Sequence, residues 1–199
     1  MHCVHKCILS LSLTHTHTHT HSLSHTHSHT HTHRQEVLFQ LPLFFLIEDT
    51  SFYWNHRALH TKWLYKYVHK LHHEFKQPNC WAVEYTHILE YSITNSMGIF
   101  LGTLLLKSHI ITFWIWLVIR LLEGIDGHCG YDFWFSPFRY FPFRPGANIH
   151  DYHHSHNVGN YGSFFMFWDH ICGTDLNYWN YKKREEKSSR QQDNKIKSS

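Results

Sequence analysis

Histidines recur at three- and four-residue spacings in this 199-residue chain, and this pattern constrains its local structure more than any other feature. One group is an HX3H motif, two are HX2HH motifs, and a further histidine lies between the second and third groups. In a helix, side chains three and four positions apart lie on the same face. The pattern therefore predicts helices that each present several imidazoles from one face. The residues are His56, His60, His69, His72, His73, His128, His150, His153 and His154.

Clustered imidazoles of this kind predict a metal centre. Imidazole is a borderline ligand that suits iron, zinc and copper, so nine histidines can hold two metal ions with four or five nitrogens each. Histidines that are separately satisfied by hydrogen bonds are the plain alternative, but the repeated spacing disfavours it. A zinc hydrolase commonly needs only three protein ligands, and the chain has no HExxH motif.

The sequence around these motifs resembles that of the fatty acid hydroxylase and sterol desaturase superfamily of membrane di-iron oxygenases. The flanks include EDTSFYWNHRALH, YKYVHKLHHEF, RLLEGIDGHCGYD and GNYGSFFMFWDHICGTD, and the resemblance covers roughly residues 43–181. Within the superfamily they are most similar to the branch that oxidises the C-4 methyl group of sterols. The resemblance implies an all-α fold, with integral membrane helices and a cytosol-facing, histidine-rich domain whose nine motif histidines hold two irons.

The resemblance also implies an activity and its partners. We expect stepwise oxidation of the C-4 methyl group of 4,4-dimethyl and 4-methyl sterols by O2 at the endoplasmic reticulum membrane, during sterol biosynthesis. Electrons would come from NAD(P)H through cytochrome b5 and its reductase, because the chain has no glycine-rich dinucleotide motif. A sister hydroxylase acting on a fatty acyl chain or another sterol position is one alternative. An inactive fragment that only binds sterol or a partner is the other.

A histidine that binds a metal is expected to donate its other ring N–H to a carboxylate or a carbonyl. The carboxylates near the motifs are Asp49, Glu74, Glu84, Asp126, Asp132 and Asp151. Related hydroxylases have a histidine where Asp132 stands, so Asp132 is expected to be either a ligand or such a partner. His87 also matches a histidine of the family, and it is a candidate ligand or cavity-lining residue.

Three segments differ in composition. Residues 1–36 form a low-complexity repeat of His, Thr, Ser and Leu, for which we expect disorder or an origin in a translated dinucleotide repeat. Residues 37–181 hold the metal motifs, and residues 182–199 form a charged cytosolic tail. Lys195 and Lys197 in this tail resemble a retrieval signal of the endoplasmic reticulum. The net charge of +3 is small, and we expect no nucleic-acid partner.

Apolar runs predict how the chain meets a membrane. Residues 93–106 and 110–122 are predicted to form a helical hairpin. Such a hairpin would bring the chain back to the side of the membrane that it left, so all three motifs could lie at one membrane face. Each run is short for a spanning helix of about 20 residues. The family begins with membrane helices ahead of the first motif, whereas residues 37–47 offer an eleven-residue apolar remnant. We therefore expect the chain to be N-terminally truncated and a poor enzyme as written.

Overall fold

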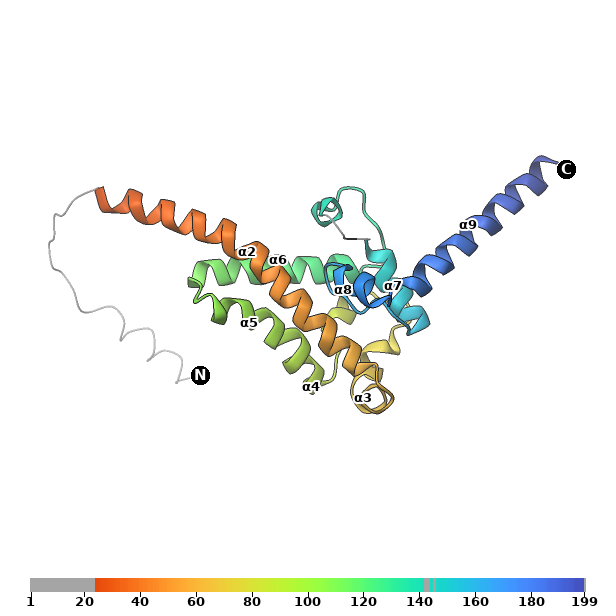
Figure 1. The fold of residues 1–199 in the computed structure, drawn as a ribbon, viewed down its shortest axis with the longest axis horizontal. Helices are drawn as coiled ribbons and strands as arrows, with labels where there is room; N and C mark the ends of the chain where they lie inside the picture. Colours follow the sequence, from red (N-terminus) through yellow and green to blue (C-terminus); the bar gives the residue numbers. More distant parts are fainter. Residues whose placement is uncertain (1–23, 142–143, 145, 199) are drawn as a thin grey trace, which may run out of the picture. The chain divides into compact units, whose positions relative to one another are not determined.

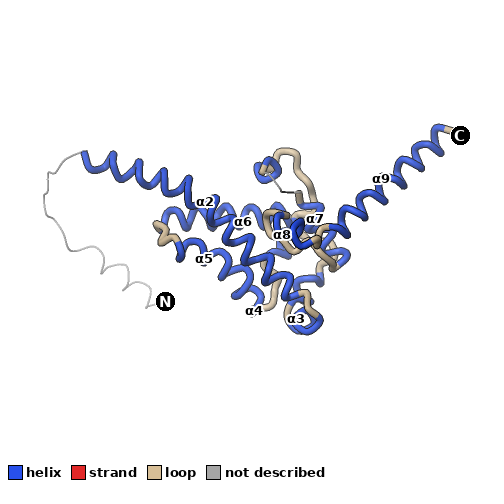
Figure 2. Tube along the Cα trace, in the orientation of Figure 1, coloured by secondary structure: helices blue, strands red, loops and turns tan. Residues whose placement is uncertain are grey.

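The computed structural model describes residues 24–141, 144 and 146–198, and every regular element in this part of the chain is a helix (Figures 1 and 2). The expected all-α fold is therefore confirmed. The elements are α2 (Ser24–Leu59), α3 (Lys62–Tyr67), η1 (His69–Glu74), η2 (Cys80–Val83), α4 (Ile88–Glu90), η3 (Tyr91–Ser96), α5 (Met97–Leu105), α6 (Ile110–His128), η4 (Pro137–Tyr140), α7 (Ala147–His156), α8 (Phe167–Cys172) and α9 (Leu176–Lys197).

The chain separates into two compact units, Met1–Glu36 and Val37–Ser199. In the first unit, residues 24–36 are helical as the start of α2, and the expectation of disorder or a repeat origin for residues 1–36 stays a prediction. This stretch contains no Gly or Pro, and extending an existing helix costs far less than nucleating a new one. The remainder of the repeat lies outside the described residues.

The second unit is organised around an aromatic core shared by α2, α5 and α6. Phe45 of α2 meets the Trp116 ring edge-on, with 4.8 Å between ring centroids, and lies 4.4 Å from the Phe164 ring. All three side chains are buried. The Trp116 indole N–H donates to the carbonyl of Ile99 in α5 at 3.2 Å. This contact satisfies the one polar atom of the ring and ties α5 to α6.

Helices η3, α5 and α6 occupy the residues expected to form a hairpin, and α5 meets α6 at the turn over residues 106–109 (Figure 1). Lys107 adopts a positive φ of 48° in this turn. Among the described helices, none combines the length and the apolar character needed to cross a bilayer. The placement of the hairpin in a membrane stays a prediction.

We predict that Phe45→Ala lowers the free energy of unfolding by about 3–5 kcal/mol, because it removes a buried ring and leaves a cavity beside Trp116. Denaturant unfolding of the purified protein measures the change. The matched control is Phe39→Ala on the same helix, whose side chain is 72% exposed and should shift the value little. Equal effects of the two substitutions would contradict this account of the core.

Candidate metal centre

Nine histidine side chains gather in two clusters within the second unit. Cluster 1 contains His56, His60, His69, His73 and His153, and cluster 2 contains His72, His128, His150 and His154. In each cluster one ring nitrogen per histidine lies within 4.8 Å of the others. The structure thus brings together all nine histidines singled out in the sequence, and either cluster can bind a metal ion. Their role as ligands stays a prediction.

The two HX2HH motifs each contribute to both clusters. His69 and His72 lie on η1, a 3-10 helix in which residues three apart eclipse each other and are separated by about 6 Å along the axis. His69 and His73 join cluster 1, whereas His72 joins cluster 2. In α7, His150 and His154 are one turn apart and join cluster 2, whereas His153 joins cluster 1. The sequence predicted that each motif presents its histidines from one face, but it did not predict that each of these two motifs divides between two clusters.

Backbone carbonyl groups fix the tautomer of several cluster histidines. A carbonyl oxygen can only accept, so a ring Nδ1 within hydrogen-bond distance of one must carry the proton, and Nε2 is left with a bare lone pair. The donors are His56 to Tyr161 at 2.9 Å, His153 to Gly159 at 2.6 Å, His128 to Gly124 at 2.9 Å and His154 to Phe75 at 3.0 Å.

Within each cluster the Nε2 atoms point toward one another, and those of His56, His128 and His154 are bare lone pairs. In cluster 1, Nε2 of His69 lies 3.1 Å from that of His56, 3.0 Å from that of His60 and 3.0 Å from that of His73. In cluster 2, Nε2 of His150 lies 2.8 Å from that of His128 and 3.1 Å from that of His154. One proton on the central ring can satisfy only one neighbour, and the remaining lone pairs repel.

A cation removes this repulsion, so the donor set fits a metal ion in each cluster. Within the described residues, the buried Nε2 of His153 also has no hydrogen-bond partner. The helix ends act in the same direction, because α6 ends at His128 and α7 ends two residues after His154. A helix C-terminus carries a partial negative charge that favours a nearby cation.

Burial holds these histidines in the neutral form that binds metal. Desolvation lowers the pKa of His60 and His72 to about 4 and that of His73 and His128 to about 3. Desolvation, reinforced by neighbouring histidines, also lowers the pKa values of the other five cluster members well below the usual range. At neutral pH no proton competes with a metal ion for these nitrogens.

The two carbonyls that orient cluster 1 belong to one short backbone segment, residues 159–162. The Asp169 carboxylate fixes this segment by accepting the backbone N–H groups of Tyr161 at 2.8 Å and Gly162 at 2.7 Å, and the Thr174 hydroxyl at 2.6 Å. Thr174 in turn contacts the Tyr53 hydroxyl of α2 at 3.2 Å. Asp169 therefore orients His56 indirectly, and the sequence analysis did not single it out.

Glu90 is the only described carboxylate that contacts a cluster histidine. Its Oε1 lies 2.8 Å from Nδ1 of His69, and burial raises the pKa of Glu90 to about 8. This residue was missed because it lies 21 positions after its partner. Its position in EYTHILE gave no local signal of this contact, because the neighbouring His87 is an extended N-cap residue outside both clusters.

The other candidate residues lie outside both clusters. His87 begins α4, where its Nδ1 accepts the Leu89 backbone N–H at 3.2 Å. Asp132 pairs with Arg139 at 3.2 Å, Asp126 pairs with Arg144 at 3.0 Å, and Glu74 accepts the Tyr85 hydroxyl at 3.1 Å. Asp49 accepts the backbone N–H groups of Phe164 and Phe165. Glu84 and Asp151 make no hydrogen bond to a histidine among the described residues.

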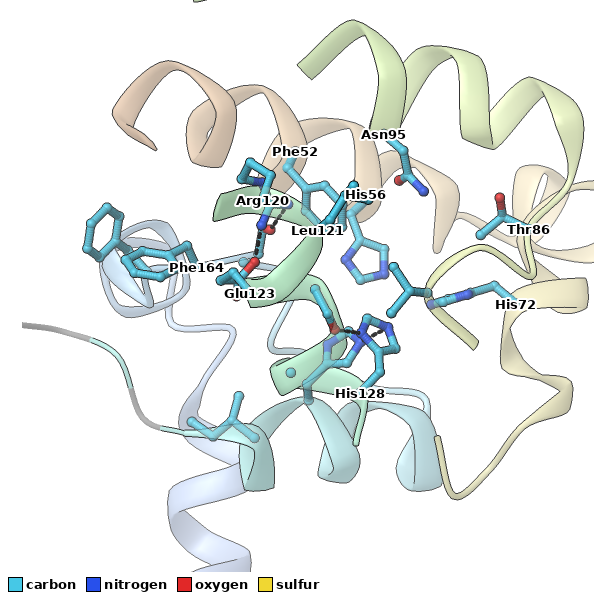
Figure 3. A pocket seen from close by; sticks show the side chains of 18 of the residues that line it. Phe52, His56, His72, Thr86, Asn95, Arg120, Leu121, Glu123, His128 and Phe164 are labelled. Carbon is cyan, nitrogen blue, oxygen red and sulfur yellow. Dashed lines mark hydrogen bonds and ion pairs between the residues drawn. The ribbon is translucent and has the colours of Figure 1, made fainter. Parts of the chain in front are cut away.

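A cavity of about 110 Å³ adjoins both clusters (Figure 3). His56 and His69 of cluster 1 and His72, His128 and His150 of cluster 2 line it. Figure 3 shows His56, His72 and His128 approaching this space from different helices. Apolar side chains, among them Phe52, Leu121 and Phe164, line other parts of the wall. The arrangement can hold a small apolar group beside two metal ions.

Comparison with known proteins gives a consistent result. A model of the fatty acid hydroxylase family matches residues 41–174. Methylsterol monooxygenase 1 of Rattus norvegicus is 49% identical over 142 residues, which is 71% of this chain and 48% of that protein. Very-long-chain aldehyde decarbonylase GL1-11 of Oryza sativa subsp. japonica is 43% identical over 157 residues, 77% of this chain and 59% of that protein. The chain thus spans about half the length of these curated relatives. No solved structure matches.

We predict that His69→Ala and His150→Ala each lower the bound metal from two ions to about one per chain, because each removes the central ring of one cluster. Metal analysis of purified protein after loading and dialysis measures the content. The control is His156→Ala on α7, outside both clusters, which should retain both ions. Full metal content in either cluster variant would contradict the ligand assignment.

A second prediction concerns the metal-free protein, whose free energy of unfolding should fall as the pH drops from 6.5 toward 4. The folded-state pKa values of His60 and His72 are about 4, below the ordinary 6.5, so the unfolded chain binds protons first. Each such histidine contributes a slope of about 1.4 kcal/mol per pH unit in this window, and its contribution is fully present above pH 6.5.

Urea unfolding at a series of pH values measures this slope. His153→Ala should reduce it, whereas His170→Ala should leave it unchanged, because the His170 side chain is 84% exposed. A stability that stays constant between pH 6.5 and 4 would show that the histidines are not buried in the neutral form.

Proposed function

Because the chain belongs to the fatty acid hydroxylase family, we propose that it is an O2-dependent oxygenase that holds one iron ion in each histidine cluster. The observation that carries the proposal is the convergence of nine neutral imidazoles on two points beside one cavity. When bound, iron supplies the activation of O2 that no amino-acid side chain provides. The residues of this chain would hold the ions, orient their ligands through backbone carbonyls and keep water away.

We further propose that the substrate is a 4,4-dimethyl or 4-methyl sterol, oxidised at its C-4 methyl group through the alcohol and aldehyde to the carboxylate. Support comes from the relatives named methylsterol monooxygenase 1, which are 45–49% identical to this chain. The cavity of about 110 Å³ is smaller than the 300–1,000 Å³ typical of pockets that enclose a whole ligand. It would take only the reacting end of a sterol, and the remaining rings would lie outside it.

A membrane surface would cover those rings. Apolar side chains of α5 and α6 are exposed, with Leu104 73%, Ile111 60% and Trp114 57% accessible. An exposed apolar surface of this extent is typical of a binding face. We propose that it lies in the endoplasmic reticulum membrane, with the histidine clusters at the cytosolic side.

The proposed reaction consumes two electrons for each oxygen atom inserted, and the second oxygen atom leaves as water. We propose that the electrons come from NAD(P)H through cytochrome b5 and its reductase. The chain contains no glycine-rich dinucleotide motif, so a separate carrier is the simpler source.

A second candidate is an activity on very-long-chain aldehydes. The relatives named very-long-chain aldehyde decarbonylase are 43–44% identical over 154–157 residues, a slightly longer match than that to the monooxygenases. The histidine clusters suit either substrate, since both reactions need O2 or a redox-active metal beside an apolar chain or ring. The two activities would therefore differ in which substrate the cavity walls contact, not in the histidine clusters.

The test is to load the purified chain with Fe(II) in phospholipid vesicles with cytochrome b5, its reductase and NADPH. Parallel samples receive 4,4-dimethylsterol, a saturated fatty acid or a very-long-chain aldehyde, and products are measured by mass spectrometry. We expect 4-hydroxymethyl and 4-carboxy sterols from the first sample only. His153→Ala should abolish them, because it removes a cluster 1 ligand.

The other outcomes contradict the sterol proposal in distinct ways. Hydrocarbon from the aldehyde with no sterol product would favour the second candidate. Turnover of the fatty acid alone would indicate a sister hydroxylase. Full iron content with no product from any substrate would indicate a chain that binds sterol or a partner without catalysis.

A further inference from the structure

One face of α6 carries a second set of chemical groups along the cavity. Arg120, Glu123, Gly124, Gly127 and His128 are spaced at i, i+3, i+4, i+7 and i+8, so they form a single stripe. All five line the cavity described above. The stripe therefore leads from charged side chains, across two glycines, to a histidine of cluster 2. The proposed function uses only its last member.

The charged end of the stripe belongs to a buried ionic network. Arg120 pairs with Glu48 of α2 at 2.8 Å and with Glu123. Arg144 pairs with Glu123 at 3.3 Å and with Asp126 at 3.0 Å. The Arg144 side chain is only 4% exposed. Its guanidinium lies over the Phe138 and Phe164 rings, at 5.1 and 5.2 Å from their centroids, and is held in a fixed position.

Two donors of this network have no acceptor among the described residues. They are Nη1 of Arg144 and Nε of Arg120, and both atoms are buried. A guanidinium nitrogen can only donate, so an acceptor oxygen would satisfy each of these donors, while the buried Oε2 of Glu48, which also has no partner among the described residues, would take a donor. A buried donor without a partner is unfavourable, and a ligand that supplies the missing acceptor gains binding free energy from it.

The net charge of this network determines which kind of substrate oxygen it can bind. Two guanidinium groups, Arg120 and Arg144, face three carboxylates, Glu48, Glu123 and Asp126. Burial raises the pKa of Glu48, and with Glu48 protonated the network is balanced at two against two. In neither state does the network have excess positive charge. A hydroxyl or carbonyl oxygen therefore suits it better than a carboxylate, whose desolvation would not be compensated.

The glycines leave room for a substrate between the network and cluster 2. A methyl group added at Gly127 would have only one neighbour within reach, Oε1 of Glu123 at 4.0 Å. Glu123 and His128 are five residues apart, which is about 7.5 Å along the helix axis. This span is comparable to a hydrogen bond to an oxygen followed by a short run of carbon atoms.

We propose that the Arg144–Glu123–Arg120 group binds a neutral oxygen of the substrate. The reacting methyl group is carried by the carbon next to the one that bears this oxygen. The methyl group lies over Gly127 and faces His128. This inference rests on the proposed sterol function. In a 4,4-dimethylsterol the matching atom is the 3-hydroxyl oxygen. The network is then a specificity-determining site, and it disfavours a free fatty acid that would place its carboxylate there.

The first test changes the ligand and needs no protein variant. Binding of radiolabelled 4,4-dimethylsterol and of its 3-deoxy analogue to the metal-free full chain in detergent micelles is compared. We expect the 3-hydroxysterol to bind about 10-fold or more tightly, because the analogue leaves buried donors unpaired. Equal affinities would overturn the oxygen site and leave the sterol function intact. Binding of neither sterol, together with no sterol oxidation, would overturn the proposed function itself.

The second test changes the protein. Arg144→Lys keeps the positive charge but loses the planar fork, so it should shrink the affinity ratio of the two sterols several-fold. The control is Arg139→Lys, a 48% exposed arginine paired with Asp132 outside the cavity, which should keep the full ratio. Gly127→Val should weaken both sterols equally and keep two bound metal ions. An unchanged ratio in Arg144→Lys, or a free fatty acid that binds more tightly than the sterol alcohol, would overturn the proposal.

Discussion

The mutual repulsion of unprotonated imidazole nitrogens is the constraint on which the rest of the second unit depends. In cluster 1 three Nε2 atoms lie 3.0–3.1 Å from that of His69, and no hydrogen-bond arrangement satisfies all of them. Carbonyl oxygens and one carboxylate contact the Nδ1 atoms of six of the nine rings and fix the orientation of those rings. Packing and hydrogen bonds therefore maintain a geometry that is favourable only with cations present, as expected for a preformed metal site.

The segment after α7 supplies much of this support. Gly159 and Asn160 adopt positive φ values of 66° and 55°, which turn the backbone so that the carbonyls of residues 159 and 161 reach different histidines. A side chain at position 159 would collide with the Thr174 carbonyl, so the first of these positions requires glycine. Asp49 and Thr50 of α2 hold the following residues, through the Phe164 and Phe165 N–H groups and the Trp168 indole. Two distant segments thereby position one cluster.

The sequence was sufficient to find the helices and the nine histidines, because i, i+3 and i+4 spacing is a local property. It was not sufficient to assign them to clusters. Both HX2HH motifs, one on the 3-10 helix η1 and one on α7, place the first and last histidine in one cluster and the middle histidine in the other, but which cluster each pair joins depends on how the helices pack. The hydrogen-bond partners of the histidines could not be predicted either, since most are backbone carbonyls, which have no sequence signature. Asp126 and Asp132 were reasonable candidates by proximity, but arginines that follow them in the chain engage both.

The ion pair between Glu48 and Arg120 joins α2 to α6 at the cavity wall. Glu48 precedes His56 on α2 by eight residues, and Arg120 precedes His128 on α6 by eight residues. Both intervals correspond to about 12 Å of helix, so the pair fixes the register of α2 against α6 and with it the relative heights of one histidine from each cluster. A buried ion pair is a weak source of stability, because desolvation offsets its attraction. Its value here is geometric, since a shift of one helical turn between α2 and α6 would separate the two clusters and close the space above Gly127.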